Sequence, residues 1–136
     1  MNSGDTRYAW ATLLFDTGDH IAAARELVDI VADNPRSTDA RMLLARAYYH
    51  SAQLGRAERE LRTIVAENPV DAYARLLLGR TLQRQSRHDE ARTHLRLAAA
   101  MGVTPEDRPA GWCRCHRRGS SSSVGRSQRP RSAAAP

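Results

Sequence analysis

Apolar and polar residues alternate with helical spacing over the first hundred residues of the chain. In the segment TDARMLLARAYYHS, which begins at residue 38, apolar residues fall on one helical stripe, and LGRAERELRTIVAEN, from residue 54, repeats this pattern. Short polar or Gly-containing segments, TGDH, SAQ and QSR, separate such stripes. The pattern predicts six helices, at residues 5–17, 21–33, 38–51, 54–67, 71–85 and 88–101.

The same residue types return every 34 residues. VADNP ends at Pro35, and VAENP ends at Pro69. Three further columns hold small or apolar residues in all three units: Ala23, Ala57 and Ala91; Leu27, Leu61 and Leu95; Leu14, Tyr48 and Leu82. Columns in phase without an insertion indicate three tandem units of two helices each. One helical hairpin cannot bury its apolar face alone, so the units are expected to stack.

Helix boundaries follow from the residues between the stripes. Pro35 and Pro69 lack an N–H and disfavour helix at the preceding Asn, so each ends the second helix of a unit. Ser37 or Thr38, and Asp71, can cap the next helix by accepting a backbone N–H. The Ala column lets the two helices of a hairpin approach closely, while the Leu four residues later fills the space beside it.

These columns resemble the tetratricopeptide repeat family, whose pattern is Trp-x2-Leu-Gly-x2-Tyr, then Ala-x3-Phe, then Pro. The matching residues are Ala23 and Pro35 in the first unit; Leu44, Tyr48, Ala57 and Pro69 in the second; Leu78, Gly79 and Ala91 in the third. Arg7, Arg41 and Arg75 replace the family's Trp, and Leu replaces its Phe. An Arg stem can cover apolar surface while its head stays in water. The resemblance implies an all-α solenoid of three hairpins in a right-handed stack over residues 1–102, with repeats at about 4–37, 38–71 and 72–102.

The resemblance also implies a concave groove, lined by the first helix of each repeat, that holds a peptide or helix of another protein. Carried over position by position, the partner-binding residues are expected to be Tyr8, Thr12, Phe15, Met42, Arg46, Tyr49, Tyr73, Leu76, Arg80 and Arg84. Asp5, Asp16 and Asp39 lie towards the other end, so the groove is expected to be acidic at its N-terminal end and basic at its C-terminal end.

Two alternatives remain open for these residues. The aromatic side chains, Phe15 and Tyr49 above all, can instead fill the core between repeats, and the Arg side chains can form a solvated face. The Lys/Asn carboxylate clamp of some family members is not expected, because the chain has no Lys and the groove positions hold no Asn.

Catalytic chemistry has little support in the sequence. His20, His50, His88 and His94 stand beside no obvious nucleophile, and a structural or surface role is expected for each. There is no Gly-rich phosphate loop or metal-ligand quartet, so neither enzyme activity nor a cofactor is expected. The CRCH segment at 113–116 offers three ligands without a fourth.

Charge is distributed unevenly along the chain. The net charge is +6, and seven of the 21 Arg residues lie in residues 103–136 with only two acidic residues. This segment is rich in Arg, Ser, Pro, Ala and Gly and is expected to be disordered. Nucleic-acid association through its Arg residues, by sequence-independent phosphate attraction, is the alternative function. No apolar run is long enough for a membrane span, and no secretory signal is recognisable, so a cytoplasmic location is expected.

The last predicted helix carries apolar residues with no following helix to cover them: Leu95, Leu97, Ala98 and Met101. A solenoid usually ends in a polar cap. Either a second copy or a partner covers this end, or a frameshift in GC-rich DNA has replaced the native continuation.

Overall fold

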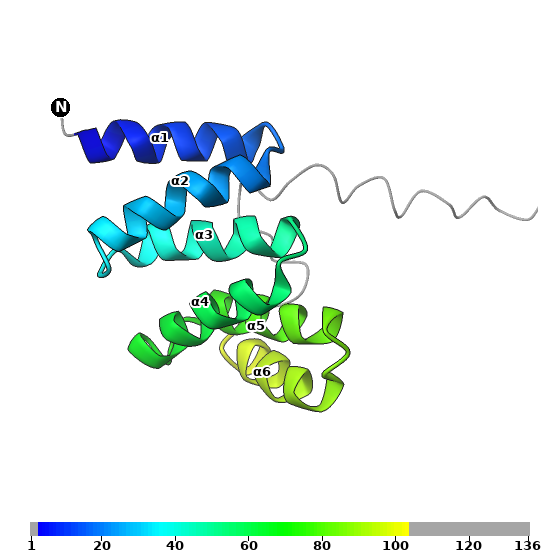
Figure 1. Cartoon of the computed structure of the whole chain (residues 1–136). Helices are drawn as coiled ribbons and strands as arrows, with labels where there is room; N and C mark the ends of the chain where they lie inside the picture. Colours follow the sequence, from blue (N-terminus) through cyan, green and yellow to red (C-terminus); the bar gives the residue numbers. More distant parts are fainter. Residues whose placement is uncertain (1–2, 104–136) are drawn as a thin grey trace, which may run out of the picture.

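Residues 3–103 fold into six helices stacked as three consecutive hairpins (Figure 1). The structure is a computed structural model that describes residues 3–103, and no strand occurs within that range. The helices are α1 Ser3–Asp16, α2 His20–Asp33, α3 Thr38–His50, α4 Leu54–Glu67, α5 Ala72–Arg84 and α6 His88–Ala100. The all-α repeat architecture expected from the sequence is confirmed, and every helix boundary lies within two residues of its expected position. The expected disordered segment and CRCH lie outside the described residues.

Side-chain caps begin the helices where the sequence indicated them. Ser37 Oγ accepts a hydrogen bond from the Ala40 N–H at 3.4 Å, and Asp71 accepts one from the Ala74 N–H at 2.9 Å. Asp19 caps α2 in the same way through the Ala22 N–H. Each bond satisfies a backbone donor that the first turn of a helix leaves unpaired.

The turn inside each hairpin places one residue in the left-handed region of backbone space. Gly18, Ala52 and Ser86 occupy equivalent positions and have φ angles of 93°, 60° and 63°. Glycine adopts this conformation freely, whereas Ala and Ser are strained in it. The turn geometry is therefore maintained in the second and third repeats without the residue best suited to it.

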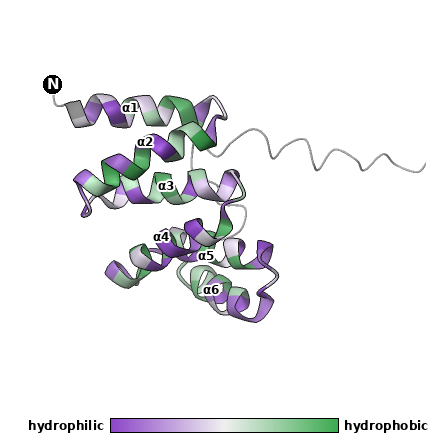
Figure 2. Ribbon diagram, in the orientation of Figure 1, coloured by the Kyte–Doolittle hydropathy of each residue, from purple (hydrophilic) through white to green (hydrophobic). Residues whose placement is uncertain are grey.

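The core runs through the stack between successive helices. Each helix packs on the next one in the chain, and Figure 2 shows apolar and polar residues alternating along every helix. Ala23, Ala57 and Ala91 are fully buried, as are Leu27 and Leu61. These are the columns that the 34-residue period predicted, and they join the two helices of each hairpin.

The Arg residues at the family's Trp position bind the second helix of their own hairpin or the loop that precedes the hairpin. Arg41 donates to Glu60 at 2.8 Å and to the Pro35 carbonyl at 3.0 Å. Arg75 donates to the Pro69 carbonyl at 2.9 Å. Arg7 pairs with Asp29 and Asp33. In each repeat the guanidinium thus ties the first helix either to the second helix or to the loop before it.

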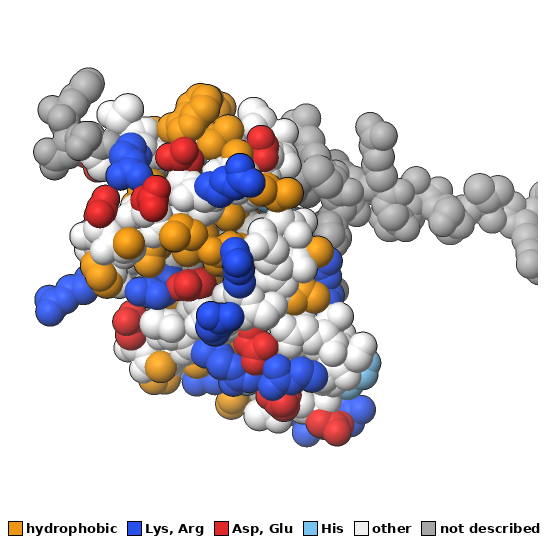
Figure 3. All heavy atoms as spheres, viewed as in Figure 1, with side chains coloured by type: hydrophobic (Ala, Val, Ile, Leu, Met, Phe, Trp, Pro, Cys, Tyr) orange, Lys and Arg blue, Asp and Glu red, His pale blue; other side chains and the backbone are white. Residues whose placement is uncertain are grey.

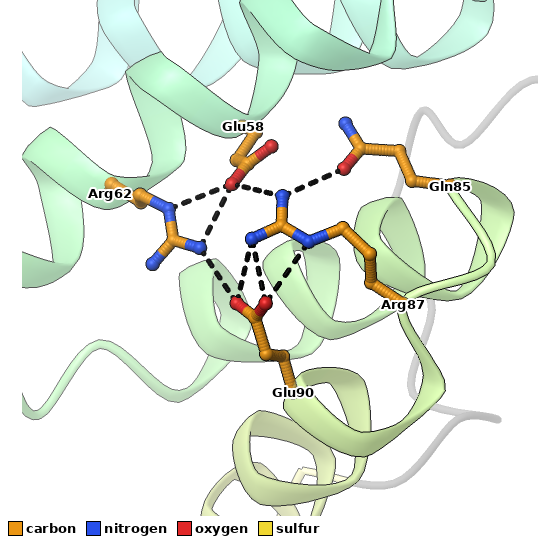
Figure 4. Close-up of polar contacts among 5 residues, drawn as sticks. All are labelled: Glu58, Arg62, Gln85, Arg87 and Glu90. Atoms are coloured by element: carbon orange, nitrogen blue, oxygen red, sulfur yellow. Dashed lines mark hydrogen bonds and ion pairs between the residues drawn. The ribbon is translucent and has the colours of Figure 1, made fainter.

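A network of charged residues joins the second and third repeats (Figure 4). Glu58 of α4 accepts hydrogen bonds from Arg62 on its own helix and from Arg87, which precedes α6. Arg87 and Arg62 both also bind Glu90 of α6, and Arg87 contacts the Gln85 side-chain oxygen. Alternating charges around this ring hold α4 against the start of α6.

Candidate functional site

Arg46 of α3 lies at the centre of the expected binding residues. Its guanidinium carbon lies 4.8 Å from the centroid of the Phe15 ring in α1. Its positive charge also acts on two tyrosines of the neighbouring repeats, where it opposes the rise in pKa that burial causes at Tyr8 and Tyr73. Side chains from the first helix of all three repeats therefore interact with one cation, Phe15 through a direct ring contact and the two tyrosines through its charge.

Both tyrosines nevertheless have raised pKa values, because burial disfavours the phenolate. Burial raises the pKa of Tyr73 to about 12, although Arg46 opposes the shift. Burial raises the pKa of Tyr8 too, and the Asp39 carboxylate raises it further. Both hydroxyls are neutral at physiological pH, because both pKa values lie above the ordinary value for tyrosine.

Arg84 of α5 contacts α3 in a second cation–ring pair. Its guanidinium carbon lies 4.7 Å from the Tyr49 ring centroid, and it donates a 2.7 Å hydrogen bond to the Tyr49 carbonyl. Arg84 as a whole is exposed. This pair repeats, one repeat later, the stacking of Arg46 on Phe15.

Two histidines complete the ring cluster near the hairpin turns. His20 and His50 stack with centroids 4.9 Å apart, and Phe15 contacts both rings edge-on. Burial lowers the pKa of His20, Arg46 lowers it further, and Asp19 opposes the shift. The structural role expected for His20 and His50 agrees with this packing, but their proximity to each other was not visible in the sequence.

A cavity of about 320 Å³ opens beside the N-terminal halves of α1 and α3. Asp5, Asp33 and Asp39 contribute carboxylates, and Tyr8 and Arg7 also line it. Asp5 and Asp39 were expected at the acidic end of the groove, whereas Asp33 comes from the end of α2. No sequence signal marked Asp33, because its position depends on how α2 packs between α1 and α3.

The ten expected binding residues divide by burial. Phe15, Tyr49 and Leu76 are 2%, 5% and 6% exposed and belong to the packed interior, the alternative left open for the two aromatics. Tyr8, Thr12, Met42, Arg46, Tyr73 and Arg80 are partly exposed, and Arg84 is exposed. We call these seven residues the groove set. Thr12 donates to the Tyr8 carbonyl at 2.9 Å, a bond within its own helix.

The chemistry available at the groove set is recognition. Guanidinium groups donate to carboxylates and carbonyls, and the phenols donate and accept. Within residues 3–103, no group of three or more His, Cys, Asp or Glu side chains is placed to hold a metal ion. None of the six helices combines the length and apolar character needed to cross a bilayer.

Comparison with known proteins identifies the repeat. The family model for the tetratricopeptide repeat matches residues 14–78. No curated protein sequence matches the chain significantly.

Solved structures share the fold at low sequence identity. A MamA structure from Desulfovibrio magneticus RS-1 superposes with a TM-score of 0.70 at 23% identity, covering 74% of this chain and 57% of that one. MamA AMB-1 gives 0.71 at 15% identity, covering 74% and 60%. A chain of the CopN–Scc3 complex gives 0.69 at 16% identity, covering 80% and 64%. The chain thus spans less than two thirds of the length of each of these structures.

Proposed function

Because this chain belongs to the tetratricopeptide repeat family, we propose that it acts as a non-enzymatic interaction module that binds a segment of another protein along the groove set. The observation that supports this most is that Arg46 stacks on Phe15 of the first repeat and that its charge also acts on tyrosines of the first and third repeats. Tyr8 and Tyr73 lie on either side of it in the repeat order, and both are only partly exposed. Rigid aromatic side chains beside a guanidinium are typical of the residues that dominate protein interfaces.

The charges give the partner segment a direction. Asp5, Asp33 and Asp39 line the cavity at one end of the groove set, whereas Arg46, Arg80 and Arg84 come later in the chain. We therefore expect a basic side chain of the partner in the acidic cavity and a carboxylate near Arg80 and Arg84. The chain of similar fold in the CopN–Scc3 complex was solved in a complex, which supports a protein partner for this fold as well.

A pull-down experiment with wild-type and variant proteins as baits tests whether the partner binds at the groove set. The full-length protein, Arg46→Ala/Arg80→Ala and Arg25→Ala/Arg59→Ala are immobilised in parallel, and proteins retained from a lysate of the source cells are quantified by mass spectrometry. The control pair removes two exposed guanidiniums of α2 and α4 outside the groove set. Proteins retained by the wild type and the control, but lost with Arg46→Ala/Arg80→Ala, are expected. Equal retention by all three baits would contradict groove binding.

A cross-linking measurement locates the partner directly. A photoreactive phenylalanine analogue at position 42, where Met42 is partly buried among the groove set, is expected to cross-link the retained protein. The same analogue at position 70, where Val70 is 76% exposed in a loop, is expected not to do so. Cross-linking from position 70 alone would place the partner elsewhere.

We propose self-association through the last helix as a second interaction. Leu97 and Met101 at the end of α6 are 41% and 40% exposed, which leaves apolar surface uncovered at this end of the stack. Such surface is a frequent mark of protein contact.

A further inference from the structure

The outer side of α1 carries apolar residues at positions that are buried in the other repeats, but no helix of residues 3–103 covers it. Trp10 and Leu13 are 51% and 52% exposed. The residues at the position of Trp10 in the next two repeats are Leu44 and Leu78, which are 2% and 1% exposed. At the position of Leu13 stand Ala47 and Thr81, both fully buried. In α3 and α5, therefore, these same positions are covered by the packed stack, and α3 and α5 each pack on the second helix of the preceding repeat.

This side of α1 is visible as an apolar patch on the molecular surface. In Figure 3 a group of apolar side chains stands out over α1, at one end of the stack. The repeat itself indicates what kind of element fits there, because α3 meets α2 and α5 meets α4 in the same arrangement. The fitting element is the second helix of a hairpin with its outer side free.

The chain contains one helix of that description among its described residues, α6. Ala24 and Val31 of α2 are 3% and 9% exposed. Their counterparts 68 residues later, Arg92 and Ala99 of α6, are exposed. The difference follows the repeat order, since α2 is followed by another repeat and no further described helix follows α6.

Both internal junctions use one register. At the first junction, Ala24 and Val28 line a cavity of about 190 Å³ together with Gln53 and Arg56 of the next repeat. At the second junction, the equivalent residues Glu58 and Arg62 bind Arg87 and Glu90 (Figure 4). The same two positions of one repeat thus face the same two positions of the next, first across a cavity and then through ion pairs.

The same register can be applied between the third repeat of one copy and the first repeat of a second copy, which gives a contact between the two copies. The positions of Glu58 and Arg62 become Arg92 and Arg96 of α6, and the positions of Arg87 and Glu90 become Asp19 and Ala22 of the first repeat. Two guanidiniums would then face the Asp19 carboxylate. Asp19 is exposed and forms no ion pair with a described residue, and the same is true of Arg96.

We infer that copies of this chain associate head to tail, with α6 of one copy packed against α1 of the next in the register of the internal repeats. Trp10 and Leu13 are buried in this contact, and Arg92 and Arg96 lie opposite Asp19. The inference rests on the proposed self-association through α6. It adds the register of the contact and identifies the outer side of α1 as the surface that α6 meets. Because the two faces differ, the contact is heterologous, and a pair of copies still has one free face of each kind to which a further copy can add.

Analytical ultracentrifugation of the full-length protein over a concentration series tests the inference. Trp10→Glu disables the face on α1, and Arg92→Glu/Arg96→Glu disables the face on α6. Val70→Glu is the matched control, because Val70 is exposed and lies in the loop between α4 and α5, outside both faces. Far-UV circular dichroism checks that each variant retains its helices.

The wild type and Val70→Glu are expected to show an average mass that rises with concentration, and each disabled variant is expected to stay monomeric. An equimolar mixture of the two disabled variants keeps one intact face of each kind, so it is expected to form a dimer and nothing larger. A wild type that is monomeric at millimolar concentration would overturn the self-association itself. If Trp10→Glu and Arg92→Glu/Arg96→Glu both associate as well as the wild type does, the proposed register alone would be overturned.

Discussion

Leu95 of α6 packs directly against Gly79 of α5. A Cβ atom at position 79 would stand 2.7 Å from both Cγ and Cδ2 of Leu95, and 3.3 Å from the Ala91 carbonyl oxygen. The equivalent positions in the other two repeats hold Ala11 and Ala45, both fully buried. In the third hairpin, therefore, the contact between α5 and α6 requires a residue without a side chain at position 79. The family pattern has Gly at this position.

Gly79→Ala is expected to destabilise the protein by about 1 kcal/mol. Overpacking a core contact costs about 1–3 kcal/mol, and replacing a helical Gly with Ala regains about 1 kcal/mol. Urea unfolding followed by circular dichroism measures the change. The double variant Gly79→Ala/Leu95→Ala should lose less stability than the sum of its single variants, because the contact is removed. A Gly79→Ala protein as stable as the wild type would contradict the close packing.

Ala52→Gly is expected to stabilise the protein by about 0.5–1 kcal/mol. Gly removes a left-handed backbone strain of about 1–2 kcal/mol. Part of this gain is offset because Gly loses more chain entropy on folding than Ala does. Ala52 has a φ of 60° in the turn between α3 and α4. Urea unfolding checks this prediction. Ala9→Gly, at an exposed position in the middle of α1, is the control and should destabilise by about 1 kcal/mol. Destabilisation by both substitutions would argue against the strained turn.

The sequence could predict the helices and their order because the signals for them are local and repeated. Pro35 and Pro69 end helices, Ser37 and Asp71 begin them, and the 34-residue period makes each assignment support the others. The same reasoning placed Ala52 in a turn but not in the left-handed region, because Ala gives no sign of that conformation.

The exposure of the expected binding residues was harder to predict, because it depends on packing between repeats. Phe15 and Tyr49 stand at the same repeat position, and Arg46 and Arg84 cover their rings from the neighbouring repeat. Position in the helix shows which way a side chain points, but not whether a long Arg from the next repeat lies over it. Asp33 lines the acidic cavity because three helices pack together there, and this packing was likewise not visible in the sequence.

Arg87→Ala is expected to lower the melting temperature at pH 7, because Glu58 and Glu90 both lose a partner. Burial alone would raise the pKa of Glu58, but hydrogen bonds from Arg62, Arg87 and Gln85 hold it below its ordinary value. The Arg87 hydrogen bonds lower the pKa of Glu90 as well. Carboxylates with depressed pKa values stabilise the fold above the unfolded pKa of about 4.3, and this contribution is lost as the pH falls through the folded-state pKa.

Differential scanning fluorimetry from pH 3 to pH 7 measures that effect. The wild type and Arg87→Ala should differ at pH 7 and converge at the acidic end of the series. Arg36→Ala serves as the control, because Arg36 is exposed in the loop between α2 and α3 and should hardly change the melting temperature. A difference between wild type and Arg87→Ala that persists unchanged at pH 3 would show that the ion pairs are not its cause.

Acid below neutral pH is expected to weaken the fold through two histidines. Burial lowers the pKa of His20 and of His94; Arg46 adds to the shift at His20, and Arg62 and Arg75 add to it at His94. A His whose folded-state pKa is depressed leaves stability unchanged above the unfolded pKa of about 6.5. As the pH falls below that value, the unfolded chain binds protons first, so stability declines until the folded-state pKa is reached.

Urea unfolding at pH values from 8 to 5.5 checks this window, which lies above that of the carboxylates. The free energy of unfolding of the wild type should fall below about pH 6.5, and His20→Leu/His94→Leu should flatten the dependence. His88→Leu is the matched control, because His88 is exposed at the start of α6. If His88→Leu flattened the curve as much as the double variant did, or if the wild type showed no decline, burial of these two rings would not control acid stability.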